Sequence, residues 1–115
     1  MKADSMPDGF LERVFQGSEG RSITVKIGIP TPTPNVLDEW SCTYQIDGLG
    51  NGKIRKSFGV DGIQAFLLGL TYVSTYLYTS EDYKNGELNW NGGLAGDLGL
   101  PIATSVADML REHKK

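Results

Sequence analysis

The fold of this chain is decided by residues 61–79, which read DGIQAFLLGLTYVSTYLYT. The large apolar side chains of this stretch recur at spacings of three and four residues, which is typical of one helical face. This main stripe consists of Ile63, Phe66, Leu67, Leu70, Val73 and Leu77. Asp61 is a suitable N-cap, and Gln64 is placed to reach back to it in a capping-box pattern. We expect one continuous helix from Asp61 to Thr79 that buries the main stripe against a sheet.

Upstream of this helix, apolar and polar residues alternate as they do in strands with one buried face. Two runs show the alternation clearly: Ile23, Val25, Ile27 and Ile29, then Trp40, Cys42, Tyr44 and Ile46. Between them, residues 31–35 carry alternate prolines, which cannot donate to a ladder and predict an irregular connection. A weaker pattern over residues 10–16 indicates one more strand.

The last strand before the helix follows a glycine-rich hairpin loop at residues 47–52. Its parity places Ile54, Phe58 and Val60 toward the core and Ser57 away from it. The pattern as a whole predicts an α+β fold in which an antiparallel meander of about four to five strands packs on one long helix.

The residues after the helix are less regular. Residues 81–86 predict a polar loop, and residues 87–90 a short strand with Leu88 and Trp90 pointing inward. A short C-terminal helix is expected from Thr104 or Ser105 onward, because apolar residues there are spaced by three and four. We expect residues 1–115 to form a single domain, with residues 1–8 as a flexible segment and 111–115 as a solvated tail.

Composition limits the classes of function. A length of 115 residues leaves room for one hydrophobic core. A net charge of −3 argues against nucleic-acid binding, which needs a basic surface. Neither a secretory signal nor a membrane span is expected, since no run of roughly 20 predominantly apolar residues occurs. The lone Cys42 permits no intramolecular disulfide, so a cytoplasmic location is expected.

The residues offer little for catalysis. His113 is the one histidine and Cys42 the one cysteine, so we identify no catalytic couple, no cofactor site and no metal site. The sequence GLGNGK at residues 48–53 departs from phosphate-binding loops, because a strand and not a helix follows it. The weak polar candidates are Arg55, Asp61 and Asp97, in a pocket between sheet and helix.

A second stripe on the helix is better suited to binding. Leu68, Tyr72 and Tyr76 are spaced by four residues beside the main stripe. Either Trp90 and the leucines after it cover these side chains within the monomer, or the stripe contacts a protein partner or a second copy in a homodimer.

Two segments carry a resemblance to a known family: GVDGIQAF at residues 59–66 and GDLGLP at residues 96–101. The chain resembles a family of small bacterial proteins of unknown function. That resemblance implies a bacterial origin and transfers no catalytic residue. We expect a non-enzymatic protein-interaction domain, with immunity-type neutralisation of a toxin as one version. The alternative is a small-molecule binding or minor enzymatic domain.

Overall fold

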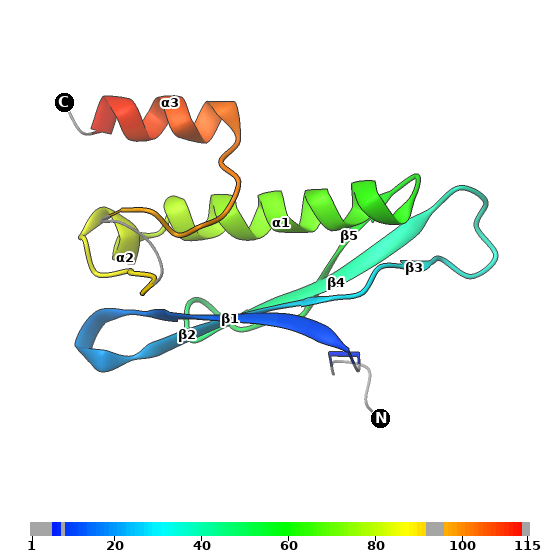
Figure 1. Ribbon diagram of the computed structural model, residues 1–115, viewed down its shortest axis with the longest axis horizontal. Helices are drawn as coiled ribbons and strands as arrows, with labels where there is room; N and C mark the ends of the chain where they lie inside the picture. The colour runs from blue at the N-terminus through cyan, green and yellow to red at the C-terminus, as the bar shows by residue number, and fades with distance from the viewer. Residues whose placement is uncertain (1–5, 8, 92–95, 114–115) are drawn as a thin grey trace.

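The structure is a computed structural model and describes residues 6, 7, 9–91 and 96–113. It confirms the α+β fold, with one antiparallel sheet packed against one long helix (Figure 1). The strands are β1 Phe10–Gln16, β2 Ser22–Gly28, β3 Thr31–Pro32, β4 Trp40–Asp47 and β5 Arg55–Gly59. The helices are α1 Gly62–Tyr78, α2 Glu81–Lys84 and α3 Thr104–His113, with a single 3-10 turn η1 at Ser18–Gly20.

Strand β4 lies at the centre of the sheet. One of its edges pairs with β2 and, further along, with β3, while its other edge pairs with β5. Strand β1 pairs with the outer edge of β2. The order β1–β2–β4–β5 is therefore the expected meander. The prediction that residues 31–35 are wholly irregular was wrong at Thr31 and Pro32, because a proline is tolerated on an edge strand.

The side chains of β5 point to the opposite faces of the sheet from those predicted. Ser57 is 1% exposed and faces α1, whereas Phe58 is 50% exposed on the outer face of the sheet. The reason is that α1 lies close to this part of β5. The Ser57 hydroxyl donates a hydrogen bond of 2.7 Å to the carbonyl of Ala65 in α1. A phenylalanine ring does not fit in that gap, so the small polar residue takes the inward position.

Helix α1 is continuous from Gly62 to Tyr78, which confirms the central prediction. The amide of Gln64 donates to the Asp61 carboxylate over 2.8 Å, as a cap requires. The return bond differs from the expected capping box. The Gln64 side chain reaches one residue further and accepts from the amide of Val60 over 2.8 Å.

The face of α1 that contacts the sheet is not the main stripe of large side chains. Ala65, Gly69 and Val73, spaced by four, are buried against it. By contrast, Ile63 is 72% and Leu67 52% exposed. Of the six residues in the predicted stripe, only Val73 and Leu77 are fully buried. Small residues occupy the sheet-facing positions because they let the helix backbone approach β5 closely.

The segment after α2 covers the C-terminal half of α1 and the neighbouring end of β1 and β2. Leu98 is fully buried there, and its amide donates to the Tyr78 hydroxyl over 2.9 Å. Arg13 of β1 donates to the carbonyls of Leu98 and Gly99 and lies 4.0 Å above the Trp90 ring. Residues 87–90, expected as a short strand, make only one isolated bridge, from Asn89 to Gln16. Leu88 is buried as expected, whereas residues 92–95 lie outside the described residues.

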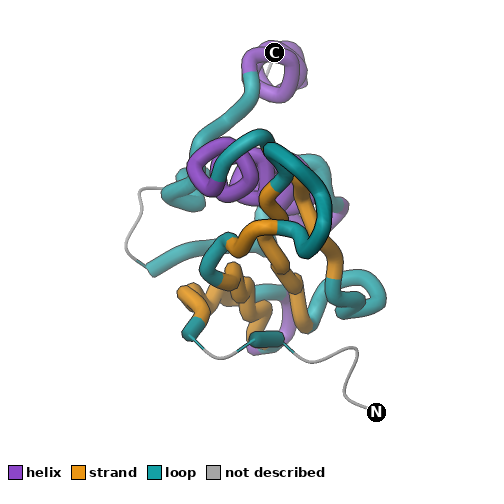
Figure 2. The backbone as a smooth tube through the Cα atoms, turned by 90° about the vertical axis from the view of Figure 1, so that its right-hand side faces the viewer, coloured by secondary structure: helices purple, strands orange, loops and turns teal. Residues whose placement is uncertain are grey.

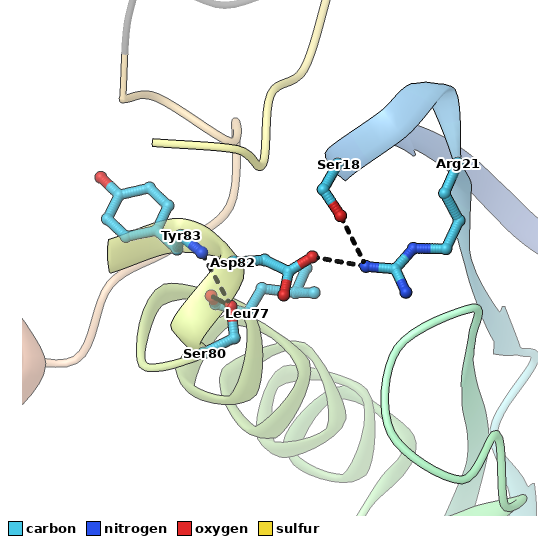
Figure 3. A network of polar contacts seen from close by, with 6 residues as sticks. All are labelled: Ser18, Arg21, Leu77, Ser80, Asp82 and Tyr83. Atoms are coloured by element: carbon cyan, nitrogen blue, oxygen red, sulfur yellow. Dashed lines mark hydrogen bonds and ion pairs between the residues drawn. The ribbon is translucent and has the colours of Figure 1, made fainter. Parts of the chain in front are cut away.

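Residues 81–84, expected in a polar loop, form the short helix α2. Ser80 caps it, since its hydroxyl accepts from the amide of Tyr83 over 3.2 Å. Arg21 at the start of β2 donates to the Asp82 carboxylate over 2.7 Å and to the Ser18 hydroxyl over 3.2 Å (Figure 3). These contacts tie the β1–β2 turn to α2.

Helix α3 lies on the side of α1 away from the sheet (Figures 1 and 2). It confirms the expected C-terminal helix, and its Val106 is buried. The helical backbone continues through His113, and the solvated tail expected at residues 111–115 stays a prediction. Most of residues 1–8, expected to be flexible, lie outside the described residues. None of the helices in the described ranges has the length and apolar character to cross a membrane.

Candidate functional site

One flank of α1 carries a row of large apolar side chains that is covered over only half its length. Ile63, Leu67, Leu70 and Leu77 follow one another at helical spacing along this flank, with the small polar Ser74 between the last two. Ser74 and Leu77 are buried, in the C-terminal half of the helix that Leu98 and its described neighbours cover. Ile63 and Leu67 are more than half exposed, because that cover does not reach them. The N-terminal half of the row is left facing solvent.

Two adjoining hollows follow this open half. The larger has a volume of about 520 Å³ and is lined by Pro30, Trp40, Asp61, Gly62, Ile63, Phe66 and Leu67. The smaller, of about 260 Å³, is lined by Leu11, Glu12, Arg13, Val25, Ile27, Phe66, Leu70 and Leu100. Both hollows include Phe66, so they form one surface, which we call the apolar groove. It runs between α1 and the strands β1 and β2, and reaches Pro30 and the start of β4 at Trp40.

One acidic side chain lies at the rim of the apolar groove. Asp61 lines the larger hollow and forms no ion pair within the described part of the chain. Glu12 is among the residues that line the smaller hollow, but it lies opposite Lys26 of β2 and its side chain faces the outer side of the sheet, because Arg13 and Phe15, which alternate with it along β1, face α1. The guanidinium of Arg13 is held by the carbonyls of Leu98 and Gly99. The groove is therefore an apolar surface with one carboxylate at its rim.

The other flank of α1 carries the predicted stripe of Leu68, Tyr72 and Tyr76. Tyr72 is 47% and Tyr76 43% exposed. Trp90 does not cover them, because its ring lies beneath Arg13 of β1. What lies beside them is the β4–β5 hairpin loop. Gly50 in that loop, with a φ of +73°, packs so closely on the Tyr76 hydroxyl that a Cβ has no room. The interface role of this stripe stays a prediction.

A small cavity of about 70 Å³ lies between this stripe and the hairpin. We call it the tyrosine pocket. It is lined by Tyr44, Ile46, Leu49, Asn51, Gly52, Lys53, Arg55, Tyr72 and Tyr76. The rings of Tyr44 and Tyr72 lie 6.3 Å apart between centroids. Burial raises the pKa of Tyr44, and the positive charge of Arg55 acts in the opposite direction.

The structure does not bring the polar candidates Arg55, Asp61 and Asp97 together. Arg55 begins β5 and lines the tyrosine pocket, whereas Asp61 lies beyond the other end of that strand. Asp97 accepts from the amide of Gly99 over 2.8 Å, beside Leu98 and the C-terminal end of α1. A helix of 17 residues is about 25 Å long, so the two aspartates lie at opposite ends of it.

The remaining groups with reactive potential are the thiol of Cys42, the possible metal ligands and the imidazole of His113. Cys42 is fully buried, and burial raises the pKa of its thiol, which disfavours the nucleophilic thiolate. In the ranges that the structure describes, no three His, Cys, Asp or Glu side chains gather where they could hold a metal ion. The side chain of His113 is not among those described.

The apolar groove was missed by reasoning from the sequence. The signal that could have revealed it is the pair Ala65 and Gly69, four residues apart on α1. Small residues at that spacing mark a face along which a helix approaches another backbone closely. Such a face turns the large side chains of the same helix toward its flanks.

Fold and surfaces together define a small α+β domain in which one antiparallel sheet carries one long helix with two open flanks. A family model described as a domain of unknown function, DUF6968, matches residues 11–102, and the chain belongs to this family. No curated protein and no solved structure shows a significant match to the chain. The family is consistent with the resemblance drawn from residues 59–66 and 96–101, while the bacterial origin stays a prediction.

Proposed function

We propose that the protein acts by associating with another protein and that the apolar groove is its contact surface. The observation that carries the proposal is the exposure of Ile63 and Leu67, 72% and 52%, beside the two apolar hollows. Contiguous exposed apolar surface in a soluble domain usually marks an interaction site. Each large aliphatic side chain that becomes buried contributes about 1.5 to 3 kcal/mol.

The chemistry of the groove favours one kind of occupant, an apolar segment that also carries basic residues. The two hollows accept aliphatic or aromatic side chains at neighbouring positions, since they meet at Phe66. The carboxylate of Asp61 at the rim complements a positive charge beside such side chains. The net charge of −3 acts in the same direction over longer distances.

A second copy of the chain is a poorer occupant. An isologous contact through the groove brings the same acidic rim together from both protomers. Asp61 then lies near the Asp61 of the second protomer, in addition to the repulsion between two chains of net charge −3. We therefore assign the groove to a different, basic protein, with homodimer formation as the outcome that contradicts the assignment.

The proposal has two further parts, the location of the protein in the cell and the kind of partner that it binds. A cytoplasmic location is supported by the single unpaired, buried thiol of Cys42. Neutralisation of a toxin is one form that association with a basic partner takes, and its support is the acidic charge alone. The partner's identity tests that form directly.

The experiment places a photocrosslinking amino acid at Leu67 and, as a matched control, at Phe58. Both side chains are about half exposed and apolar, but Phe58 lies on the opposite face of the sheet. The protein that crosslinks in the native host is identified by mass spectrometry and purified. Its affinity for the wild-type chain, Leu67→Glu and Phe58→Glu is then measured by calorimetry.

We expect a discrete heterologous adduct from position 67 and none from position 58. We expect Leu67→Glu to weaken binding at least tenfold, because it buries an unpaired carboxylate, with Phe58→Glu close to wild type. Rising salt weakens the complex if the acidic rim contributes. Adducts only between copies of this chain, identical adducts from both positions, or equal affinities of the two variants contradict the proposal.

A further inference from the structure

The tyrosine pocket has a composition that the proposed association does not explain. It lies on the flank of α1 opposite the apolar groove and is lined by residues from three elements. Tyr44 comes from β4, Tyr72 and Tyr76 from α1, and Lys53 and Arg55 from the end of the hairpin loop and the start of β5. One water molecule needs roughly 15 Å³, so a cavity of about 70 Å³ admits a group of several atoms.

The pocket presents hydrogen-bond donors and positive charge without a carboxylate among its lining residues. Within the described ranges, neither Arg55 nor Lys53 forms an ion pair, and the hydroxyls of Tyr44, Tyr72 and Tyr76 make no hydrogen bond to protein. Arg55 lies close enough to Tyr44 for its charge to act on the hydroxyl. The donors are therefore available to a ligand.

The framework around these donors is fixed. The Asn51 side chain accepts from the amide of Lys53 over 2.9 Å, which holds the loop in its turn. The Gln45 side chain donates to the carbonyl of Gly52 over 2.8 Å from the central strand. Gly50 rests on the Tyr76 hydroxyl. A cavity whose loop is held at three points is pre-organised for a ligand, because little entropy is lost on binding.

We propose that the tyrosine pocket binds a small oxyanion, namely a phosphate or carboxylate group. Arg55 provides a planar pair of donors that matches either group, and Lys53 adds a second positive charge. The hydroxyls of Tyr72 and Tyr76 supply further hydrogen bonds from the helix, and that of Tyr44 supplies one from β4. The alternative reading, a solvated basic edge, assigns no special role to the hydroxyls or to the cavity.

The test titrates inorganic phosphate and, separately, acetate into the protein at constant ionic strength. Chemical shifts of the Tyr44 and Tyr72 rings are read by NMR on tyrosine-labelled protein. The variants are Arg55→Gln and Tyr72→Phe, with Lys56→Gln as the matched control. Lys56 belongs to the same basic run, but β5 turns it to the outer face of the sheet, opposite Thr43.

We expect saturable shifts of both rings with at least one of the two anions, and the stronger binder identifies the preferred group. Arg55→Gln is expected to weaken that binding about tenfold or more, since a charge-assisted pair of hydrogen bonds is lost. Tyr72→Phe weakens it less, and Lys56→Gln leaves it unchanged. Shifts that rise linearly without saturation for both anions, or an equal loss in Lys56→Gln, overturn the proposal. Melting temperatures confirm that each variant is folded.

Discussion

Asp61 shows how one side chain sets the start of the long helix. Its carboxylate accepts the hydrogen bond of the Gln64 amide, one of the four amides at a helix start that have no partner within the helix. Its backbone is extended, with φ −147° and ψ 178°, so the helix begins cleanly at Gly62. The same residue lies at the rim of the apolar groove, where its charge is available to a partner.

Replacement of the cap tests this assignment. Asp61→Ala is expected to lower the free energy of unfolding by about 0.5 to 2 kcal/mol, because the Gln64 amide loses its acceptor. Asp61→Asn is the matched control, since asparagine caps nearly as well. Urea titrations of the three proteins give the comparison. Equal stability of Asp61→Ala and wild type would show that the cap contributes nothing.

At the scale of elements, the seam between α1 and β5 determines how the helix sits. Ala65 and Gly69 on the helix meet Ser57 and Gly59 on the strand, and no side chain in this seam is large. A Cβ at Gly59 lies only 2.5 Å from the amide nitrogen of Ala65 and 2.9 Å from the carbonyl carbon of Gln64. The helix backbone itself occupies the space.

The seam predicts a large effect from one methyl group. Gly59→Ala is expected to destabilise the fold by about 1 to 3 kcal/mol, because backbone and not a flexible side chain must move. Val60→Ala, at the exposed neighbouring position, is expected to stay within about 0.5 kcal/mol of wild type. Denaturant titration measures both. If the two substitutions cost the same, the close approach is wrong.

The buried end of α1 predicts an alkaline limit to stability. Burial raises the pKa of Tyr78 above its ordinary value of 10.0, so the folded state holds the phenol neutral. An unfolded chain releases that proton at lower pH. The stabilisation is therefore fully present below about pH 10 and is lost as the pH rises through the folded pKa.

Tyr78→Phe separates two contributions of this residue to stability. One is the hydrogen bond from the Leu98 amide, and the other is the pH dependence caused by the raised pKa of the phenol. At neutral pH the variant loses about 1 to 3 kcal/mol, because the buried amide of Leu98 has no acceptor. Between about pH 9 and pH 11 its stability should fall less steeply than that of wild type. Tyr44 and Tyr83, whose pKa values are also raised by burial, keep part of the slope in both proteins. An unchanged slope contradicts the role of Tyr78.

The positions of β2, β4 and α1 could be predicted from local sequence pattern, whereas the face that α1 turns toward the sheet could not. Alternation in β2 and β4 and the Asp61 cap located the strands and the helix start, because periodicity and capping are properties of neighbouring residues. The main stripe from Ile63 to Leu77 suggested the wrong buried face, because apolar character alone cannot tell a covered flank from an open one. The small residues Ala65 and Gly69 decided that question through contacts with β5, a strand outside the helix.

Some residues of the candidate sites could be singled out from the sequence, whereas the way they come together depends on the fold. The tyrosine stripe and Arg55 were singled out from the sequence, but their meeting in one pocket depends on the hairpin fold. Asp61 and Asp97, grouped with Arg55 by residue type, lie at opposite ends of α1. The apolar groove escaped prediction, since it is lined by residues of β1, β2 and β4 that lie far from α1 in the sequence.

At the scale of the whole molecule, α1 separates two surfaces of opposite character. One flank is apolar with an acidic rim, and the other is a donor-rich pocket with two basic side chains. A single helix without any charged residue from Gly62 to Tyr78 serves both. We therefore expect the proposed protein association at the groove and the proposed anion binding at the pocket to be independent, so that loss of one by mutation spares the other.

The most direct measurement asks which side chains of α1 face water in the isolated protein. A soluble paramagnetic probe is added to protein with labelled isoleucine, leucine and valine methyl groups, at a concentration where light scattering shows a monomer. We predict strong relaxation at Ile63 and Leu67 and little at Val73 and Leu77, in keeping with their exposure. Protection of Ile63 and Leu67 equal to that of Val73 would mean that the groove is closed, and the proposed contact surface would not exist.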